Sequence, residues 1–269
     1  MKKLATALVS VAAIMTMSTT AFAAENPAEV FDRVMEKNNT IQSAEIQSGV
    51  HSVILAKDVI PDGQMKVDMA MHAEMDMQDT TDLKYLAQVA SSILGQDSYS
   101  QVFYTDGYYY VDANGVKLKY PMPLEQIISS VQTGVNTSNM ESSYMKGISL
   151  NEVNGKRVLA YEANPKKLNK NVKEALGTVM NTLGTDVNLD MNIQEMKGAY
   201  VLDDNDYIIY MTNYIVYNME VLDQPMTCIT LMETEVQNPG EPVVVTLPST
   251  DGYEDLIGLY DGVIESEVE

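Results

Sequence analysis

Cysteine, histidine, tryptophan and basic residues are scarce in this 269-residue chain. The single cysteine, Cys228, cannot form a disulfide within the chain. It lies in the alternating run 226–231, which predicts a buried, small hydrophobic side chain rather than a reactive thiol. Because tryptophan is absent and only 3 phenylalanines are present, the 16 tyrosines carry most of the aromatic burial. The lack of tryptophan argues against an aromatic platform for carbohydrate.

Catalytic and metal-binding motifs are also missing from the sequence. The 2 histidines, His51 and His72, both lie within expected strands. The chain contains no H-E-x-x-H, C-x-x-C or G-x-S-x-G sequence and no glycine-rich phosphate loop. The acidic run 203–206 lacks the glycine and the distal glutamate of a calcium loop and predicts a turn. We therefore expect a protein that is not an enzyme and needs no metal or other cofactor.

Basic residues are far fewer than acidic ones. The chain has 17 basic and 38 acidic residues, a net charge of −21. Removal of residues 1–23 would leave 15 basic residues against the same 38 acidic ones. A field of this sign repels nucleic acid and anionic lipid headgroups, which excludes both as partners bound through charge.

Long apolar runs are absent except at the N-terminus. Lys2 and Lys3 precede an apolar stretch over residues 4–17, and Ala21-Phe22-Ala23 fits a signal peptidase site. This stretch is shorter than the ~20 residues of a membrane-spanning helix, so residues 1–23 are predicted to be a cleaved signal peptide, with a retained anchor as the alternative. No cysteine follows the site for lipid attachment. We expect a secreted, extracytoplasmic protein with no stable membrane span.

Strict alternation over residues 65–77 is the clearest structural pattern in the chain. Methionine, valine and alanine occupy the odd positions, and charged or polar residues occupy most of the even ones. Period-2 alternation predicts a strand with one buried and one wet face. At ~3.3 Å per residue the strand would be about 43 Å long, which predicts a large, curved sheet.

The remaining periodicities complete an expected α+β domain over residues 24–269. Amphipathic helices are predicted over 26–38, 82–94, 123–134 and 164–184, with a short one over 254–259. Further strands are predicted over 42–55, 101–104, 108–111, 117–120, 146–152, 156–163, 187–202, 206–221, 225–236 and 242–247. Asp-Gly and Asn-Gly pairs at 106–107, 114–115 and 154–155 predict hairpin turns. Residues 260–269 are expected to be a frayed acidic tail. Helices should pack on one side of an antiparallel sheet.

Methionine is the unusual feature, and it suggests a binding face. Thioether side chains are flexible and polarizable, and they suit surfaces that accept variable apolar shapes. If the sheet curves and the helices cover it incompletely, its methionine-rich side lines a groove for an apolar ligand. The candidate ligand-binding residues are Met65, Val67, Met69, Met71, Met75, Met77, Met191, Ile193, Met211, Ile215 and Tyr217.

Two other interpretations of the methionines stay open. They can form an ordinary filled core, or they can bind copper(I) together with His72. Parity argues against copper, because an even-numbered His72 points away from odd-numbered methionines in an extended strand. Alternate residues of one strand are also ~6.6 Å apart, too far to share a metal without help from a neighbouring strand.

The layout resembles the LolA/LppX-like superfamily. The resemblance rests on the signal peptide, the N-terminal helix, the long antiparallel strands, a tyrosine-rich meander ending at residues 117–120 and a closing strand at 245–248. It points to secreted or lipid-anchored members from Gram-positive bacteria. It implies a strongly curved, incomplete antiparallel β-barrel with amphipathic helices on its concave side, where known members bind lipids or acyl chains. Unlike many relatives, this chain has no cysteine at the cleavage site.

Together these patterns predict a secreted, non-enzymatic protein that holds a lipid or acyl chain in a methionine-rich half-barrel cavity. One alternative is a structural or protein-interaction module of the cell envelope, with an envelope protein as partner and no ligand. A second alternative is an extracellular copper-binding protein.

Overall fold

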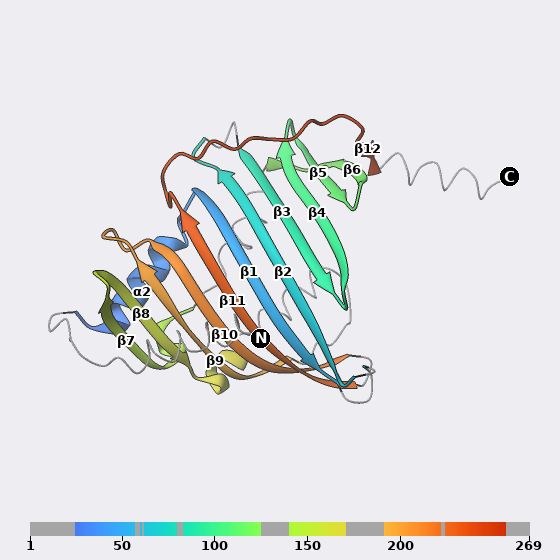
Figure 1. Cartoon of the computed structure of the whole chain (residues 1–269). Coiled ribbons are helices and arrows are strands. Elements are labelled where there is room, and N and C mark those ends of the chain that lie inside the picture. The colour runs from blue at the N-terminus through green and yellow to red at the C-terminus, as the bar shows by residue number, and fades with distance from the viewer. Residues whose placement is uncertain are drawn as a thin grey trace.

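One antiparallel sheet dominates the fold of the protein (Figure 1). The computed structural model describes residues 25–56, 60, 62–79, 83–124, 140–170, 191–221 and 224–256. The strands are β1 (Ser43–Leu55), β2 (Gln64–Asp76), β3 (Lys84–Ile93), β4 (Gln96–Thr105), β5 (Tyr108–Ala113), β6 (Val116–Pro121), β7 (Met145–Val153), β8 (Lys156–Ala163), β9 (Met191–Leu202), β10 (Ile208–Val221), β11 (Gln224–Gln237) and β12 (Glu254–Asp255). The helical elements are α2 (Pro27–Asn38), a 3-10 turn, η1 (Ser142–Tyr144), and a helical segment whose described part is residues 165–170.

The order of the strands joins the two halves of the chain at β1. The sheet runs β12-β6-β5-β4-β3-β2-β1-β11-β10-β9-β8-β7, so each strand pairs mostly with its neighbour in sequence. The exceptions are the short β12, which pairs with β6, and β1, which pairs with β2 on one side and with β11 on the other. A meander of β2–β6 and a meander of β7–β11 therefore meet on the first strand of the chain.

The predicted α+β class is wrong. The chain is mostly β, built on one large open sheet, and lacks the predicted layer of amphipathic helices among its described residues. The N-terminal helix forms as predicted, and helix begins again at Pro165 as predicted. The helix predicted over 123–134 lies outside the described residues except for its first two, as do residues 171–184, the signal peptide and the acidic tail.

Segment 82–94 is the clearest error, since it forms strand β3 instead of a helix. Apolar residues occupy both odd and even positions of this strand because both faces of the sheet are buried at this end. Leu86 packs on one face against Phe103 and Val245, while Leu83 and Tyr85 pack on the other against Met75. A strand that is buried on both faces lacks period-2 alternation, so the spacing of its apolar residues can resemble that of a helix. Gly95, expected to end a helix, instead forms a hairpin turn with Leu94, both at positive φ.

The three predicted hairpin turns are confirmed. Asp106-Gly107, Asn114-Gly115 and Asn154-Gly155 all have two successive residues at positive φ, between 51° and 87°. This conformation matches the twist of a two-residue hairpin and favours these residue pairs. The predicted strand 242–247 is wrong, because residues 242–250 have no regular secondary structure. Of the helix predicted over 254–259, Glu254–Asp255 instead pairs with β6 in parallel, and residues 257–259 lie outside the described residues.

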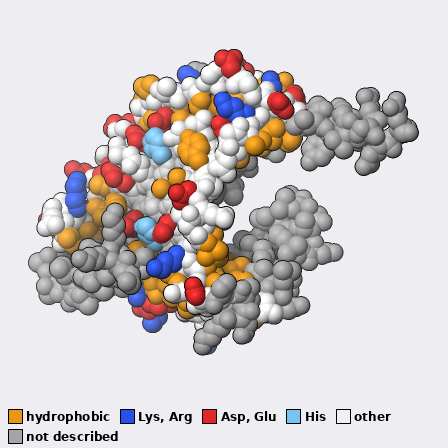
Figure 2. All heavy atoms as spheres, turned by 45° about the vertical axis from the view of Figure 1, so that its right-hand side comes forward, with side chains coloured by type: hydrophobic (Ala, Val, Ile, Leu, Met, Phe, Trp, Pro, Cys, Tyr) orange, Lys and Arg blue, Asp and Glu red, His pale blue; other side chains and the backbone are white. Residues whose placement is uncertain are grey.

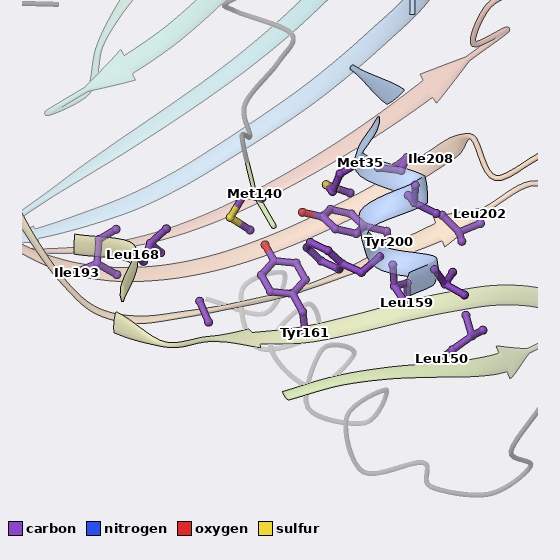
Figure 3. Close-up of a cluster of buried hydrophobic side chains, with 14 residues drawn as sticks. Met35, Met140, Leu150, Leu159, Tyr161, Leu168, Ile193, Tyr200, Leu202 and Ile208 are labelled. Atoms are coloured by element: carbon purple, nitrogen blue, oxygen red, sulfur yellow. The ribbon is translucent and has the colours of Figure 1, made fainter. Parts of the chain in front are cut away.

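Helix α2 covers one end of the sheet. Asn26 caps the helix by accepting a hydrogen bond from the Ala28 amide at 3.1 Å, and Pro27 fits its first turn. Its buried face packs against β8 and β9, where Phe31 meets Tyr161 edge-on at 5.8 Å between ring centroids. Figure 3 shows Tyr161 and Tyr200 side by side in what we call the first core cluster. Its buried members are Val30, Phe31, Val34, Met35, Met140, Leu150, Leu159, Tyr161, Ala163, Leu168, Ile193, Tyr200, Leu202 and Ile208.

Charged side chains fix α2 to the β9–β10 turn. Residues 203–206 form the predicted turn, and Asp206 accepts hydrogen bonds from Arg33, at 2.9 Å, and from Arg157. Burial by itself would raise the pKa of Asp206, but the hydrogen bond from Arg33 and the charge of Arg157 outweigh it and lower that pKa. These two arginines therefore have a structural role, holding α2 and β8 to the β9–β10 turn.

Two further clusters bury the opposite end of the sheet. One gathers Ala44, Met75, Met77, Leu83, Tyr104 and Met122. The other lies on the reverse face, where the segment after β11 crosses β3–β5 and places Val245 and Tyr253 on Phe103 and Tyr110. In Figure 1 this segment runs along one end of the strands towards β12. No helix among the described residues has the length and hydrophobicity needed to span a membrane.

We predict that Gly198→Ala destabilises the protein. An added Cβ would lie 2.6 Å from the Thr212 carbonyl oxygen and 2.9 Å from the Tyr161 ring, and also too close to Asn213. We expect a loss of about 1–3 kcal/mol in the free energy of unfolding, measured with urea. Gly49→Ala is the matched control, because its Cβ would meet nothing within 4 Å. Equal stability of the two variants would contradict the packing described for β9.

Candidate functional site

Antiparallel register sorts the strand side chains onto two faces. We call the side that carries Met65, Val67, Met69, Met71 and Met75 the methionine face, and the side that carries His51 and His72 the histidine face. Residues opposite each other in a ladder point to the same side of the sheet. In one row across the sheet, Val67 lies opposite Ser52, Ser52 opposite Thr230 and Thr230 opposite Ile215.

Every predicted ligand-binding residue within a strand lies on the methionine face. Met191 and Ile193 on β9 stand opposite Met219 and Tyr217 on β10, and Met211, Ile215 and Tyr217 share that side. Met77 follows β2 directly and is buried in the same cluster as Met75. The structure thus brings the predicted residues to one surface, while their role in binding a ligand stays a prediction.

Along this surface the predicted residues divide into core and open positions. Met75 and Met77 are 1% and 3% exposed, and Ile193 belongs to the first core cluster. Met211, Ile215 and Tyr217 are partly buried against that same cluster. In contrast, Met69 and Met71 are 38% and 37% exposed, in the middle of the sheet. The filled-core interpretation therefore holds for the two ends of this face and fails between them.

The open part of the face is continuous across three strands. It consists of the exposed Met69, Met71 and Ile93 and the half-buried Val50, Met65, Val67 and Val89, which lie on β1, β2 and β3; we call this set the open apolar stretch. Ile93 is 43% exposed. Contiguous exposed apolar surface on a soluble protein commonly marks a binding site.

Sequence reasoning missed Val50, Val89 and Ile93 as members of this stretch. Val50 belongs to an alternating run in a correctly predicted strand, so its parity could have identified it. Val89 and Ile93 lie in the segment predicted to be a helix, and periodicity alone does not indicate which face of the sheet they occupy.

Hydroxyl groups are interspersed with the apolar side chains of the methionine face. Ser48 and Thr234 share a hydrogen bond of 2.9 Å, as do Ser52 and Thr230, and Ser91 and Ser98 share one of 2.6 Å. Each pair bridges neighbouring strands at directly opposed positions. These groups are polar and uncharged, and they satisfy each other without a ligand.

Most charged side chains of the described strands lie on the histidine face. In β1–β6 and β9–β11 the register places every charged residue on the histidine face; these are Glu45, Lys66, Asp68, Glu74, Asp76, Lys84, Asp97, Asp112, Lys117, Lys119, Glu195, Lys197, Glu220, Glu233 and Glu235. On the methionine face, the described strands carry charge only at the two edges of the sheet: Glu152 and Arg157 are opposed in the β7–β8 hairpin, and Glu254 of β12 lies opposite Leu118 of β6.

The histidine face holds a shallow polar depression of about 770 Å³. Gly49, Ala70 and Ala90, opposed on β1–β3, are among its lining residues, as are Tyr99 and Tyr210. Figure 2 shows both histidines (pale blue) on this face. His51 Nδ1 lies 2.7 Å from Asp68, and His72 Nε2 lies 3.2 Å from Glu45.

His72 therefore points away from the methionines, as its parity predicts, and cannot join Met69 and Met71 around one ion. Within the described part of the chain, no three or more histidine, cysteine or acidic side chains are grouped so as to hold a metal.

The sequence matches the model of a family of unknown function, DUF6612, over residues 26–248. The chain belongs to this family. The match spans α2, the long strands and the segment that crosses β3–β5. No curated protein matches the chain.

Solved structures similar to this DUF6612 chain include LprF from Mycobacterium bovis, with 10% identity, a TM-score of 0.35 and coverage of 83% of this chain and 97% of LprF. The ywiB protein from Bacillus subtilis has 11% identity, a TM-score of 0.24 and coverage of 74% and 96%. A β-barrel-like protein of the DUF1849 domain of unknown function, from Brucella abortus, has 10% identity, a TM-score of 0.25 and coverage of 74% and 100%. Similarities this low assign neither ligand nor function, and the LolA/LppX-like relation stays a prediction.

Cys228 lies on the methionine face of this DUF6612 chain. Its side chain is 1% exposed and unpaired with any other cysteine, which confirms the predicted burial. Burial raises the pKa of the Cys228 thiol, and a hydrogen bond with Tyr217 only partly offsets the rise. The thiol is therefore protonated at neutral pH and serves as packing.

We predict that Cys228 resists alkylation in the folded protein. Because the thiolate is the reactive form and its pKa is raised, we expect iodoacetamide at about pH 8 to label it at least about a hundredfold more slowly than in urea-unfolded protein. The rate should increase with pH, and mass spectrometry would follow it. Labelling of the folded protein at the unfolded rate would contradict the burial of Cys228.

Proposed function

We propose that this protein is a non-enzymatic, extracytoplasmic binding protein that holds an apolar ligand, such as a lipid or acyl chain, against the open apolar stretch. The observation that carries the proposal is the exposure of Met69 and Met71 in the middle of a sheet face whose two ends are buried, together with that of Ile93 at the end of β3. An ordinary wet strand position in so acidic a protein would carry a polar or charged side chain.

Hydrophobic burial supplies enough free energy for such binding. Each buried methylene contributes about 0.8 kcal/mol, so eight methylenes laid along the stretch would contribute about 6 kcal/mol before the cost of association is subtracted. Methionine side chains can adjust to chains of different shape, which suits a site without strict geometric selection. The flanking core clusters hold the strands, so the surface exists before the ligand arrives.

The proposal is tested by native mass spectrometry of protein purified from bacteria without detergent. We expect a bound apolar mass in the unsubstituted protein and its loss in Met69→Glu, because the new carboxylate would be desolvated under the chain. Ala70→Glu adds the same charge to the next residue, on the histidine face, and should keep the ligand. Met75 is unsuitable for this test, since at 1% exposure its replacement by glutamate would disrupt the core.

Two outcomes would overturn the proposal. One is an apo mass that stays unchanged after incubation with a lipid extract. The other is a bound mass that Ala70→Glu removes and Met69→Glu leaves in place. Either result would favour an envelope module that binds another protein and holds no ligand.

A further inference from the structure

We propose that the ligand of the methionine face is an uncharged amphiphile, a long apolar chain with a neutral hydroxyl or ester head, and not an anionic one such as a fatty acid or a phospholipid. This inference rests on the proposed function and specifies its ligand class. It follows from how charge and hydroxyl groups are distributed over the two faces.

The first step is the absence of a counter-charge. Across β1–β6 and β9–β11, the described strands place no charged side chain on the methionine face, even where that face is open to solvent. Three basic residues elsewhere are engaged in ion pairs: Lys197 pairs with Glu195 on the histidine face, and Arg33 and Arg157 pair with Asp206. A carboxylate or phosphate laid on this surface would meet no cation from these described strands to offset its lost hydration.

The second step is the field around the site. The chain carries a net charge of −21, and strand carboxylates such as Glu45, Asp68 and Glu233 lie on the reverse of the same strands. Such a field lowers the local concentration of anions and disfavours their binding. A neutral amphiphile experiences no such repulsion.

The third step is the polar groups that the face does offer. The pairs Ser91–Ser98 and Ser52–Thr230 border the open apolar stretch and consist of hydroxyls alone. A hydroxyl can both donate and accept a hydrogen bond, so each pair can turn towards a neutral oxygen of a ligand. Hydroxyl or ester oxygens at the end of an apolar chain complement this mixture.

Ligands that share one oleyl chain and differ in the head test the inference. Monooleoylglycerol is neutral, oleate is anionic and oleylamine is cationic at about pH 8. Each is titrated below its aggregation limit against protein loaded with the fluorescent apolar probe N-phenyl-1-naphthylamine. We expect monooleoylglycerol to displace the probe at a concentration at least about tenfold lower than oleate in low salt.

A matched pair of variants identifies the face responsible. Ser91 faces the methionine side and its neighbour Ser92 the histidine side, so Ser91→Lys and Ser92→Lys change the net charge equally. We expect Ser91→Lys to improve the affinity for oleate by about two- to fivefold relative to Ser92→Lys, because only the former adds a cation beside the ligand. Thermal unfolding confirms that both variants fold.

The outcomes separate the two proposals. Binding of oleate as tight as that of monooleoylglycerol, unaffected by Ser91→Lys, would overturn the neutral-ligand inference and leave the apolar site in place. Preferential binding of oleylamine would overturn it in favour of a cationic head. Failure of all three ligands and of the probe to bind would overturn the proposed function itself.

Discussion

The pairing of β1 with both β2 and β11 holds the two halves of the molecule together. Eleven residue pairs, from Glu45–Gln237 to Leu55–Thr227, join strands almost 200 residues apart in sequence. Every other long strand pairs with a neighbour in sequence, so this ladder alone turns two meanders into one sheet. It also fixes register across the centre, where a slip of one residue would move every side chain to the wrong face.

From that register follows the division of β1–β6 and β9–β11 into a face without charged side chains and a charged one. Both ends of the methionine face are buried, one under α2 and the other in the cluster around Met75 and Tyr104. The centre, around Met69 and Met71, is apolar and yet exposed. An apolar centre between buried flanks is the basis for the proposed ligand site, and its lack of charge is the basis for the proposed neutral ligand.

Much of this could be predicted wherever local chemistry decides the structure. The alternation in β2, the three Asn-Gly or Asp-Gly turns and the cap of α2 each depend on a few adjacent residues. The α+β class failed because β3 is covered on both faces, by Met75 on one and by Val245 from the far end of the chain on the other. No local window contains that second partner, so the pattern of Leu86, Val89 and Ile93 resembled a helix. The division of the methionines into core and open positions was likewise unpredictable, because it depends on where α2 and Tyr104 pack.

Methionine methyl NMR with a neutral amphiphile tests the central claim most directly. In protein labelled with carbon-13 at its methionine methyl groups and assigned by single Met→Leu substitutions, monooleoylglycerol should shift the Met69 and Met71 signals. The signal of Met35, 5% exposed on the buried face of α2, should stay in place. Unchanged Met69 and Met71 signals at saturating ligand, or shifts confined to methionines away from the open apolar stretch, would contradict the account.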